Sequence, residues 1–193
     1  MRLNKRKRIP KFLADNASRW NAAHVSRHGQ GFAFRWSTLN GKPANRLLLP
    51  HLIAMTLNHC SYCDGFPLGE TSRRTIDHFK PASKFPHLAY QWENLFICCD
   101  VCQQRLDAYD NLLLKPDAAD YSFKRYFQFN PSTGRIVPNP QGTARDRECA
   151  KITIRLFDFN NWVRRNSRLR FFKIFKTARI SGINDRPFRF LFE

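Results

Sequence analysis

Hydrophobic residues recur at helical spacing in two parts of the chain. Residues 46–58 are rich in Leu and Ile, and Pro50 fits best near a helix start, so we expect a helix from about residue 50 to residue 58. From about residue 144 the pattern turns helical again. We expect its aromatic stripe to be a packing face rather than a platform for nucleic-acid bases. The apolar positions at helical spacing are Ile152, Leu156 and Phe159, then Trp162, Leu169, Phe172 and Phe175.

Between these helical regions, two short apolar runs predict strands. Residues 74–79 form the first, and a proline soon after them ends it because proline lacks the donor that a strand ladder needs. Residues 92–98 form the second, after a loop over 81–91 that contains Pro81 and Pro86. Asp100 can cap a helix that follows at once, and Gln103 would complete a capping-box-like pair. The predicted order is strand, long loop, strand, helix.

The remaining segments are less regular. Two apolar segments at 127–129 and 135–137 flank a turn and predict a small hairpin in a region rich in Pro and Gly. The first 45 residues are polar and basic with scattered aromatics, which predicts loops and short elements wrapped around the core. The chain is long enough for one α+β domain with extensions. We divide it into a basic N-terminal extension (1–45), a core (46–143) and a basic helical C-terminal extension (144–193), packed as a single unit.

The chain is strongly basic, with 33 Lys and Arg against 15 Asp and Glu and a formal net charge of +18. Residues 2–8 carry five basic groups and residues 161–184 carry seven, with no acid in either segment. Such an excess favours a nucleic acid as the partner, although one charge run alone is often a solvated face. The seven are Arg164, Arg165, Arg168, Arg170, Lys173, Lys176 and Arg179.

No apolar stretch approaches the ~20 residues of a membrane span. The basic N-terminus has no apolar run behind it, so it does not resemble a secretory signal. We therefore expect a cytoplasmic protein without a membrane partner.

Four of the six cysteines form two Cys-x-x-Cys pairs separated by 35 residues. Four thiolates at this spacing can close one tetrahedral zinc site, and the alternative is four reduced cysteines without a metal. In a basic chain without a signal, metal ligation is favoured over disulfides. We expect Cys98 to be a strand residue and Cys149 to be an ordinary buried thiol. The predicted zinc ligands are Cys60, Cys63, Cys99 and Cys102.

The segment between the cysteine pairs holds an acid, a base and an amide, which metal-assisted phosphodiester chemistry can use. The Asp-His-x-x-Pro sequence at 77–81, followed by Asn94, resembles the HNH endonuclease superfamily and its ββα-metal motif. The likeness is strongest to the HNH nuclease subunit of Septu-type and retron-associated antiphage defence systems, and it covers about residues 46–165. The segments that carry it are 60–64, 76–86, 88–95 and 134–138.

The resemblance implies a zinc-stapled ββα-metal core with mainly helical N- and C-terminal extensions. It implies that His78 is the general base, which a near-neutral imidazole suits. Asp77 is then a ligand to a catalytic Mg²⁺ or Mn²⁺ ion, and Asn94 pins the loop and orients the histidine. It also implies a DNA substrate and a partner, an SMC/ABC-like ATPase that controls cleavage.

One departure affects the catalytic metal. The family usually has Asn as the second metal ligand and Lys three residues later, whereas this chain has Gln103 and Leu106. A Gln carbonyl can coordinate a hard cation, but its side chain is longer, and Gln103 can instead simply cap its helix. An HNH-like module that binds nucleic acid or a partner without cutting is therefore the main alternative to a nuclease. A zinc-knuckle component of an RNA–protein particle is a third hypothesis.

Cations near the predicted hairpin would hold the substrate backbone without reading its sequence. The basic C-terminal helix could also bind phosphates, or it could dock a partner. DNA is the expected substrate, with RNA as the alternative. His87 is a further candidate for the site, although a loop or packing role suits it better. The predicted phosphate-binding residues are Arg73, Arg74, Lys80 and Lys84.

Overall fold

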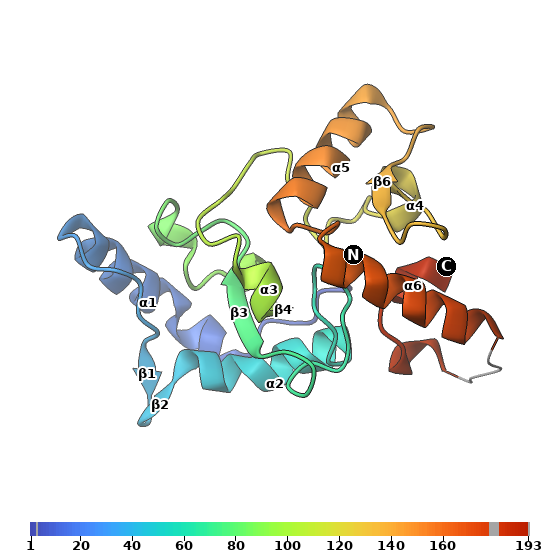
Figure 1. The fold of residues 1–193 in the computed structure, drawn as a ribbon. Helices are drawn as coiled ribbons and strands as arrows, with labels where there is room; N and C mark the ends of the chain where they lie inside the picture. The colour runs from blue at the N-terminus through green and yellow to red at the C-terminus, as the bar shows by residue number, and fades with distance from the viewer. Residues whose placement is uncertain (3, 178–181, 193) are drawn as a thin grey trace.

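The computed structural model describes residues 1–2, 4–177 and 182–192 and has a mixed α+β architecture (Figure 1). Three two-stranded antiparallel sheets occur in this part of the chain, each formed by strands that are neighbours in sequence. The helices and strands are α1 (Lys11–Gly29), β1 (Thr38–Leu39), β2 (Lys42–Pro43), α2 (Ala44–Thr56), β3 (Arg74–His78), β4 (Leu95–Cys99), α3 (Asp100–Gln103), α4 (Phe123–Tyr126), β5 (Phe127–Phe129), β6 (Ile136–Pro138), α5 (Ala144–Leu156) and α6 (Trp162–Thr177). Short 3₁₀ helices lie at Pro86–Leu88, Trp92–Asn94, Ile183–Asp185 and Arg189–Phe192.

A central hairpin of β3 and β4 runs through the middle of the molecule, with α3 following β4 directly (Figure 1). In its register Asp77 faces Phe96 and His78 faces Leu95. All five residues of β4 are buried, and α2 packs against this strand. The predicted order of strand, long loop, strand and helix is confirmed. One buried hydrophobic cluster joins this hairpin to residues of α1 and of the C-terminal elements.

The start of α3 differs from the prediction. Asp100 is the first helical residue, and the Sγ atom of Cys99 caps the helix by accepting the backbone N–H of Cys102. Gln103 does not reach back to the cap, so the predicted capping box is wrong. A true capping box occurs instead at the start of α5, where Thr143 and Asp146 bond reciprocally.

Helix α2 begins six residues earlier than predicted, at Ala44, and it contains Pro50 in its interior. Proline removes one backbone donor and normally disfavours a helix interior. Here Pro50 lies on the exposed side, while Leu48, Leu52 and Met55 on the opposite side are buried. Burial of that apolar face outweighs the lost hydrogen bond.

The N-terminal extension contains a long helix, as the resemblance implied, although its composition predicted loops and short elements. Helix α1 buries Leu13, Trp20, Asn21 and His24, which lie at helical spacing. Two of these four residues are polar, so apolar periodicity could not reveal the buried face. The helix packs beside the 3₁₀ turn at Pro86–Leu88, and Asn21 accepts the backbone N–H of Tyr90.

The C-terminal region has the predicted β5–β6 hairpin and helices, and the predicted packing face of α6 is confirmed in part, because Phe172 contacts Phe129 and Phe192 and Phe175 contacts Phe192. Trp162 is 74% exposed, whereas Arg164 and Arg168 are buried. Arg168 donates to the carbonyl oxygens of Gly134 and Phe159, so it ties α6 to the hairpin. Two of the seven basic residues of this segment are therefore structural, and Arg179 lies outside the described residues. None of the described helices is long and apolar enough to cross a bilayer.

The segment after residue 181 returns to the centre of the molecule. Arg189 forms a buried bidentate ion pair with Asp64, which follows the first cysteine pair, and its backbone N–H donates to the same carboxylate. Phe188 donates its backbone N–H to the Asp64 carbonyl. These contacts join residues about 125 positions apart and hold the C-terminal segment on the cysteine loop.

Candidate functional site

The four predicted zinc ligands meet at one point. Their Sγ atoms all lie within 4.8 Å of one another, and all four residues are buried. The Sγ atoms of Cys63 and Cys99 are 3.7 Å apart. A tetrahedral ion with Zn–S bonds of about 2.3 Å separates its sulfurs by about 3.8 Å. The cluster can therefore hold a structural metal ion such as zinc.

Donors around this cluster suit negatively charged sulfurs. The backbone N–H of Cys99 points to the Sγ of Cys60, and Nη2 of Arg164 lies 3.1 Å from the Sγ of Cys102. Burial lowers the pKa of the Arg164 guanidinium, but the surrounding cysteines raise it more, so its pKa is raised overall. A buried cation beside sulfur fits four thiolates on a divalent ion, whose net charge is negative. This contact also fixes α6 to the cluster.

His78 ends β3 with its ring enclosed by aromatic side chains. The ring stacks on Trp36 at a centroid distance of 5.4 Å and an interplanar angle of 18°, and Phe34 meets its edge at 4.7 Å. The Nε2 atom lies 2.9 Å from the Ala89 carbonyl oxygen, so it carries the proton and donates. Burial lowers the pKa of His78 to about 4. The ring is therefore neutral at neutral pH, and its Nδ1 atom is the acceptor.

Asp77 is buried and already bonded. Its Oδ2 atom accepts from the Tyr62 hydroxyl at 2.6 Å and from Arg105 Nη2 at 2.6 Å. The Arg105 guanidinium is fully buried and also donates to the carbonyl oxygens of His78, Phe79 and Ala108. Burial raises the pKa of Asp77, while Arg105 and Tyr62 lower it in part.

Replacing Tyr62 with Phe should lower the free energy of unfolding by about 1.5–3 kcal/mol, the typical value of a hydrogen bond to a charged group. The ring would still stack on Phe157, 4.2 Å away, so the loss comes from the hydroxyl alone. Urea unfolding followed by circular dichroism measures it. Tyr109→Phe is the matched control, because that hydroxyl makes no hydrogen bond to the described residues. Equal stability of Tyr62→Phe and wild type would contradict the assignment.

Gln103 lies beside the second oxygen of Asp77. Its Nε2 is 3.4 Å from Asp77 Oδ1, and its Oε1 accepts from the Cys98 thiol at 3.3 Å. The structure thus brings the two predicted metal-binding residues together at one wall. A carboxylate and an amide can both supply hard oxygen ligands, with Oδ1 as the carboxylate oxygen not held by Arg105. In this structure the amide turns Nε2 toward Oδ1 and Oε1 toward Cys98, so Gln103 would have to rotate its amide to offer its oxygen to a shared cation.

Asn94 fixes the loop between the two strands. Its Oδ1 accepts from the Lys80 backbone N–H at 2.7 Å, and its Nδ2 donates to the carbonyl oxygens of Lys80 and Leu88 at 3.0 Å each. The next residue, Ala89, accepts the bond from His78. Asn94 therefore holds the segment that orients the histidine without contacting the ring.

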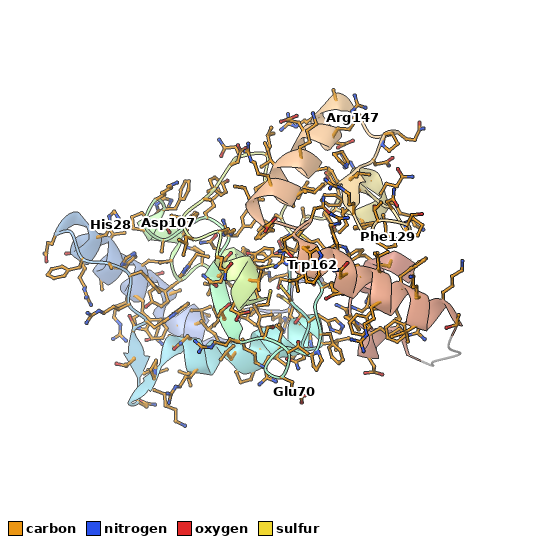
Figure 2. The ribbon with its side chains drawn as sticks, viewed as in Figure 1. His28, Glu70, Asp107, Phe129, Arg147 and Trp162 are labelled. Carbon is orange, nitrogen blue, oxygen red and sulfur yellow. The ribbon has the colours of Figure 1, made fainter. Side chains whose placement is uncertain are left out.

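An open cavity of about 460 Å³ lies in front of Asp77, His78 and Gln103. Its other wall comes from the loop after α1, and Figure 2 shows His28 and Asp107 close together at this edge of the molecule. Neither the position of this loop at the cavity nor the buried Arg105 was predicted from the sequence. Aromatic residues were visible in the N-terminal extension, but only the fold brings them to the histidine. The facing wall consists of His28, at the end of α1, and of Gly31, Phe32, Ala33 and Phe34. The rest of the lining consists of Pro81, Ala82, Ser83, Leu106 and Asp107.

The four predicted phosphate-binding residues differ in the contacts that their side chains make. Arg73 and Lys84 are exposed. Arg74 begins β3, four residues before His78, and its Nε donates to the Leu68 carbonyl, so this side chain supports a loop. Lys80 lies over the Phe85 ring at 5.4 Å. None of the four lines the cavity among the described residues.

The remaining candidates have ordinary roles. His87 is exposed and does not line the cavity in the described part of the chain. Cys98 is a buried residue of β4 that bonds Thr75, and Cys149 is buried in α5. In the N-terminal basic run, Arg6 is also structural, because it pairs with Asp117 and donates to the backbone of Trp92 and Leu95.

Comparisons with known proteins give one informative match. No protein-family model matches the chain. The chain is 29% identical over 82 residues to the Septu protein PtuB of Bacillus thuringiensis. This match covers 42% of the chain and spans 31% of the length of that relative.

Proposed function

We propose that this protein is a metal-dependent nuclease of the HNH type, which hydrolyses phosphodiester bonds in DNA. The observation that carries the proposal is the cavity wall, where a neutral histidine adjoins a carboxylate and an amide. The similarity to a Septu protein and the net charge of +18 support it independently. RNA is the alternative polyanion.

In this proposal each residue has a distinct task. His78, held through Nε2 by the Ala89 carbonyl, accepts a proton from the attacking water at Nδ1. Asn94 keeps the loop and therefore the ring in place. Asp77 and Gln103 would hold a Mg²⁺ or Mn²⁺ ion, which would supply charge neutralisation at the scissile phosphate. Arg105 and Tyr62 fix Oδ2 of Asp77, so Oδ1, which here accepts from Nε2 of Gln103, is the oxygen that would bind a cation.

We also propose that the protein acts as an effector in antiphage defence, as its likeness to Septu-type proteins suggests. Such an effector requires a partner that restrains it, and an SMC/ABC-like ATPase is the expected one. A pull-down from cells that express the neighbouring genes tests this partner. Recovery of the protein alone would contradict that part of the proposal.

The test of activity is incubation of supercoiled plasmid with the purified protein and Mg²⁺ or Mn²⁺, with and without the partner. We expect nicked or linear product with metal and none with a chelator. Intact plasmid under every metal condition would contradict a nuclease that cuts duplex DNA. Product that forms equally in excess chelator would contradict its metal dependence.

Nucleic-acid affinity should depend steeply on salt, because basic side chains that neutralise phosphates release counterions. For about six phosphate contacts the affinity should fall about 10³-fold between ~50 and ~200 mM salt. Fluorescence anisotropy with a labelled duplex measures this slope in chelator, where cleavage cannot interfere. A shallow slope would mean that the charge serves another purpose.

A binding module without cleavage is the second candidate, and the Asp77–Arg105 pair favours it. Arg105 already neutralises the carboxylate, which lowers its attraction for a divalent cation. The plasmid assay separates the two functions, since a pure binding module retains the salt-dependent affinity and leaves the plasmid intact.

A further inference from the structure

Phe32 is a large aromatic side chain that the fold leaves in solvent at the edge of the cavity. It is 54% exposed, and it lines the same cavity as His78. Phe32 follows the end of α1, where Gly31 has a φ of +84°. The backbone N–H of Phe32 donates to the carbonyl of Arg27 in the last turn of that helix, which fixes the backbone position of Phe32. Phe34, two residues later, packs against His78 instead.

A cation and a second apolar side chain accompany Phe32. The guanidinium of Arg27 lies 5.6 Å from the centre of the Phe32 ring. Leu106, 72% exposed, lines the same cavity from the α3 side. The cavity of about 460 Å³ falls within the usual range of small-ligand sites, about 300–1,000 Å³. An exposed aromatic ring with an adjacent cation, in a chain of net charge +18, suits a planar base on a phosphate backbone.

We propose that Phe32 and Arg27 bind an unpaired base of a nucleic-acid strand, so that the substrate is single-stranded at the cavity. This inference rests on the proposed nuclease function for its meaning, but the binding itself does not require cleavage. A paired base inside a duplex is covered on both faces by its neighbours, so the Phe32 ring can stack only on a base that has left the helix. Arg27 then contacts an adjoining phosphate.

The experiment measures binding by fluorescence anisotropy in chelator, with short single-stranded DNA, single-stranded RNA and the matching DNA duplex. We expect wild-type protein to prefer a single strand over the duplex. Phe32→Ala should weaken single-strand binding by roughly 5- to 150-fold, the usual effect of removing one stacking ring, and should leave duplex binding unchanged. Phe32→Tyr should retain most of the affinity, since it keeps the ring. The DNA and RNA arms identify which strand is preferred.

Trp162→Ala is the matched control, because Trp162 is an exposed aromatic residue at the start of α6 and does not line the cavity (Figure 2). It should leave both affinities unchanged. Equal affinity for single strand and duplex, or unchanged single-strand binding by Phe32→Ala, would overturn the inference. Such a result alongside plasmid cleavage leaves the nuclease standing, whereas Phe32-dependent binding without any cleavage leaves the base site standing and removes the nuclease.

Discussion

Removal of zinc is expected to unfold the centre of this protein. Structural zinc contributes about 10–16 kcal/mol in small zinc-dependent folds, whereas a whole domain is stable by only about 5–15 kcal/mol. Here the four buried sulfurs hold together the loop before β3, the end of β4 and the start of α3. Without an ion, sulfurs within 4.8 Å of one another must protonate or move apart. The buried guanidinium of Arg164 would then lose the negatively charged sulfur that offsets the free-energy cost of its burial.

The measurement combines metal analysis with unfolding. We expect one zinc per chain by elemental analysis, and loss of the cooperative urea transition after a strong chelator. Cys102→Ser should lower both zinc content and stability. Cys149→Ser is the matched control, since Cys149 is buried but lies outside the cluster, and it should keep full zinc content. Unchanged unfolding of the chelated protein would contradict a structural metal.

The four-cysteine cluster and the central hairpin were predictable because their signals are local. A Cys-x-x-Cys spacing restricts two sulfurs to one turn, and 35 intervening residues leave room for a strand and a loop. Residue order alone then places Asp77 and His78 at the end of the first strand. The α5 helix and the β5–β6 hairpin were likewise visible from periodicity and turn residues.

What the sequence did not reveal depends on contacts between distant segments. Helix α1 buries Asn21 and His24, whose polarity hid the packed face. Helix α6 buries Arg164 and Arg168, because sulfurs and carbonyl oxygens from other segments accept their hydrogen bonds. The charge run there predicts a surface for phosphates or for a partner, whereas Arg164 and Arg168 stabilise the fold. No periodicity encodes such partners.

The cavity likewise combines residues that the sequence predicted with residues that only the fold brings there. The sequence supplied its catalytic candidates, but it could not show that the loop after α1 forms the facing wall. It could not show Arg105 either, because a buried arginine is identified only by its acceptors. Arg105 binds Asp77 and three carbonyl oxygens, which fixes the carboxylate while reducing its charge. In the proposed nuclease, metal affinity at this site would therefore depend on a compromise between rigid placement of the carboxylate and its attraction for a cation.

His78→Ala should lower the rate of phosphodiester cleavage by about 10²–10⁴-fold, the usual contribution of a general base. The Nε2–H bond to Ala89 leaves Nδ1 as the proton acceptor, and His78 adjoins Asp77. His28 lines the same cavity and contacts the Ser83 carbonyl through its own Nε2, but it lies on the facing wall. The measurement is single-turnover cleavage of plasmid with Mn²⁺. A rate equal to wild type would exclude His78 as the base.

The control must separate chemistry from packing, because the His78 ring stacks on Trp36 and Phe34, and its removal leaves a void there. Zinc content and thermal unfolding of His78→Ala show whether the centre stays folded. His87 is exposed and lies in the connection between β3 and β4, and the His87→Ala variant should cleave at the wild-type rate. An equal loss in both variants would mean that the loop as a whole, rather than the imidazole, supports activity.

The depressed pKa of His78, about 4, makes this test more informative. A base with so low a pKa is fully unprotonated at neutral pH but accepts a proton weakly. A negatively charged phosphate that binds beside it stabilises the protonated ring and raises its pKa toward the working range. In the proposed mechanism the enclosed imidazole would therefore become an effective base only with substrate present. Histidine NMR should show this as a higher His78 pKa in the presence of a non-cleavable oligonucleotide, and an unchanged value would contradict it.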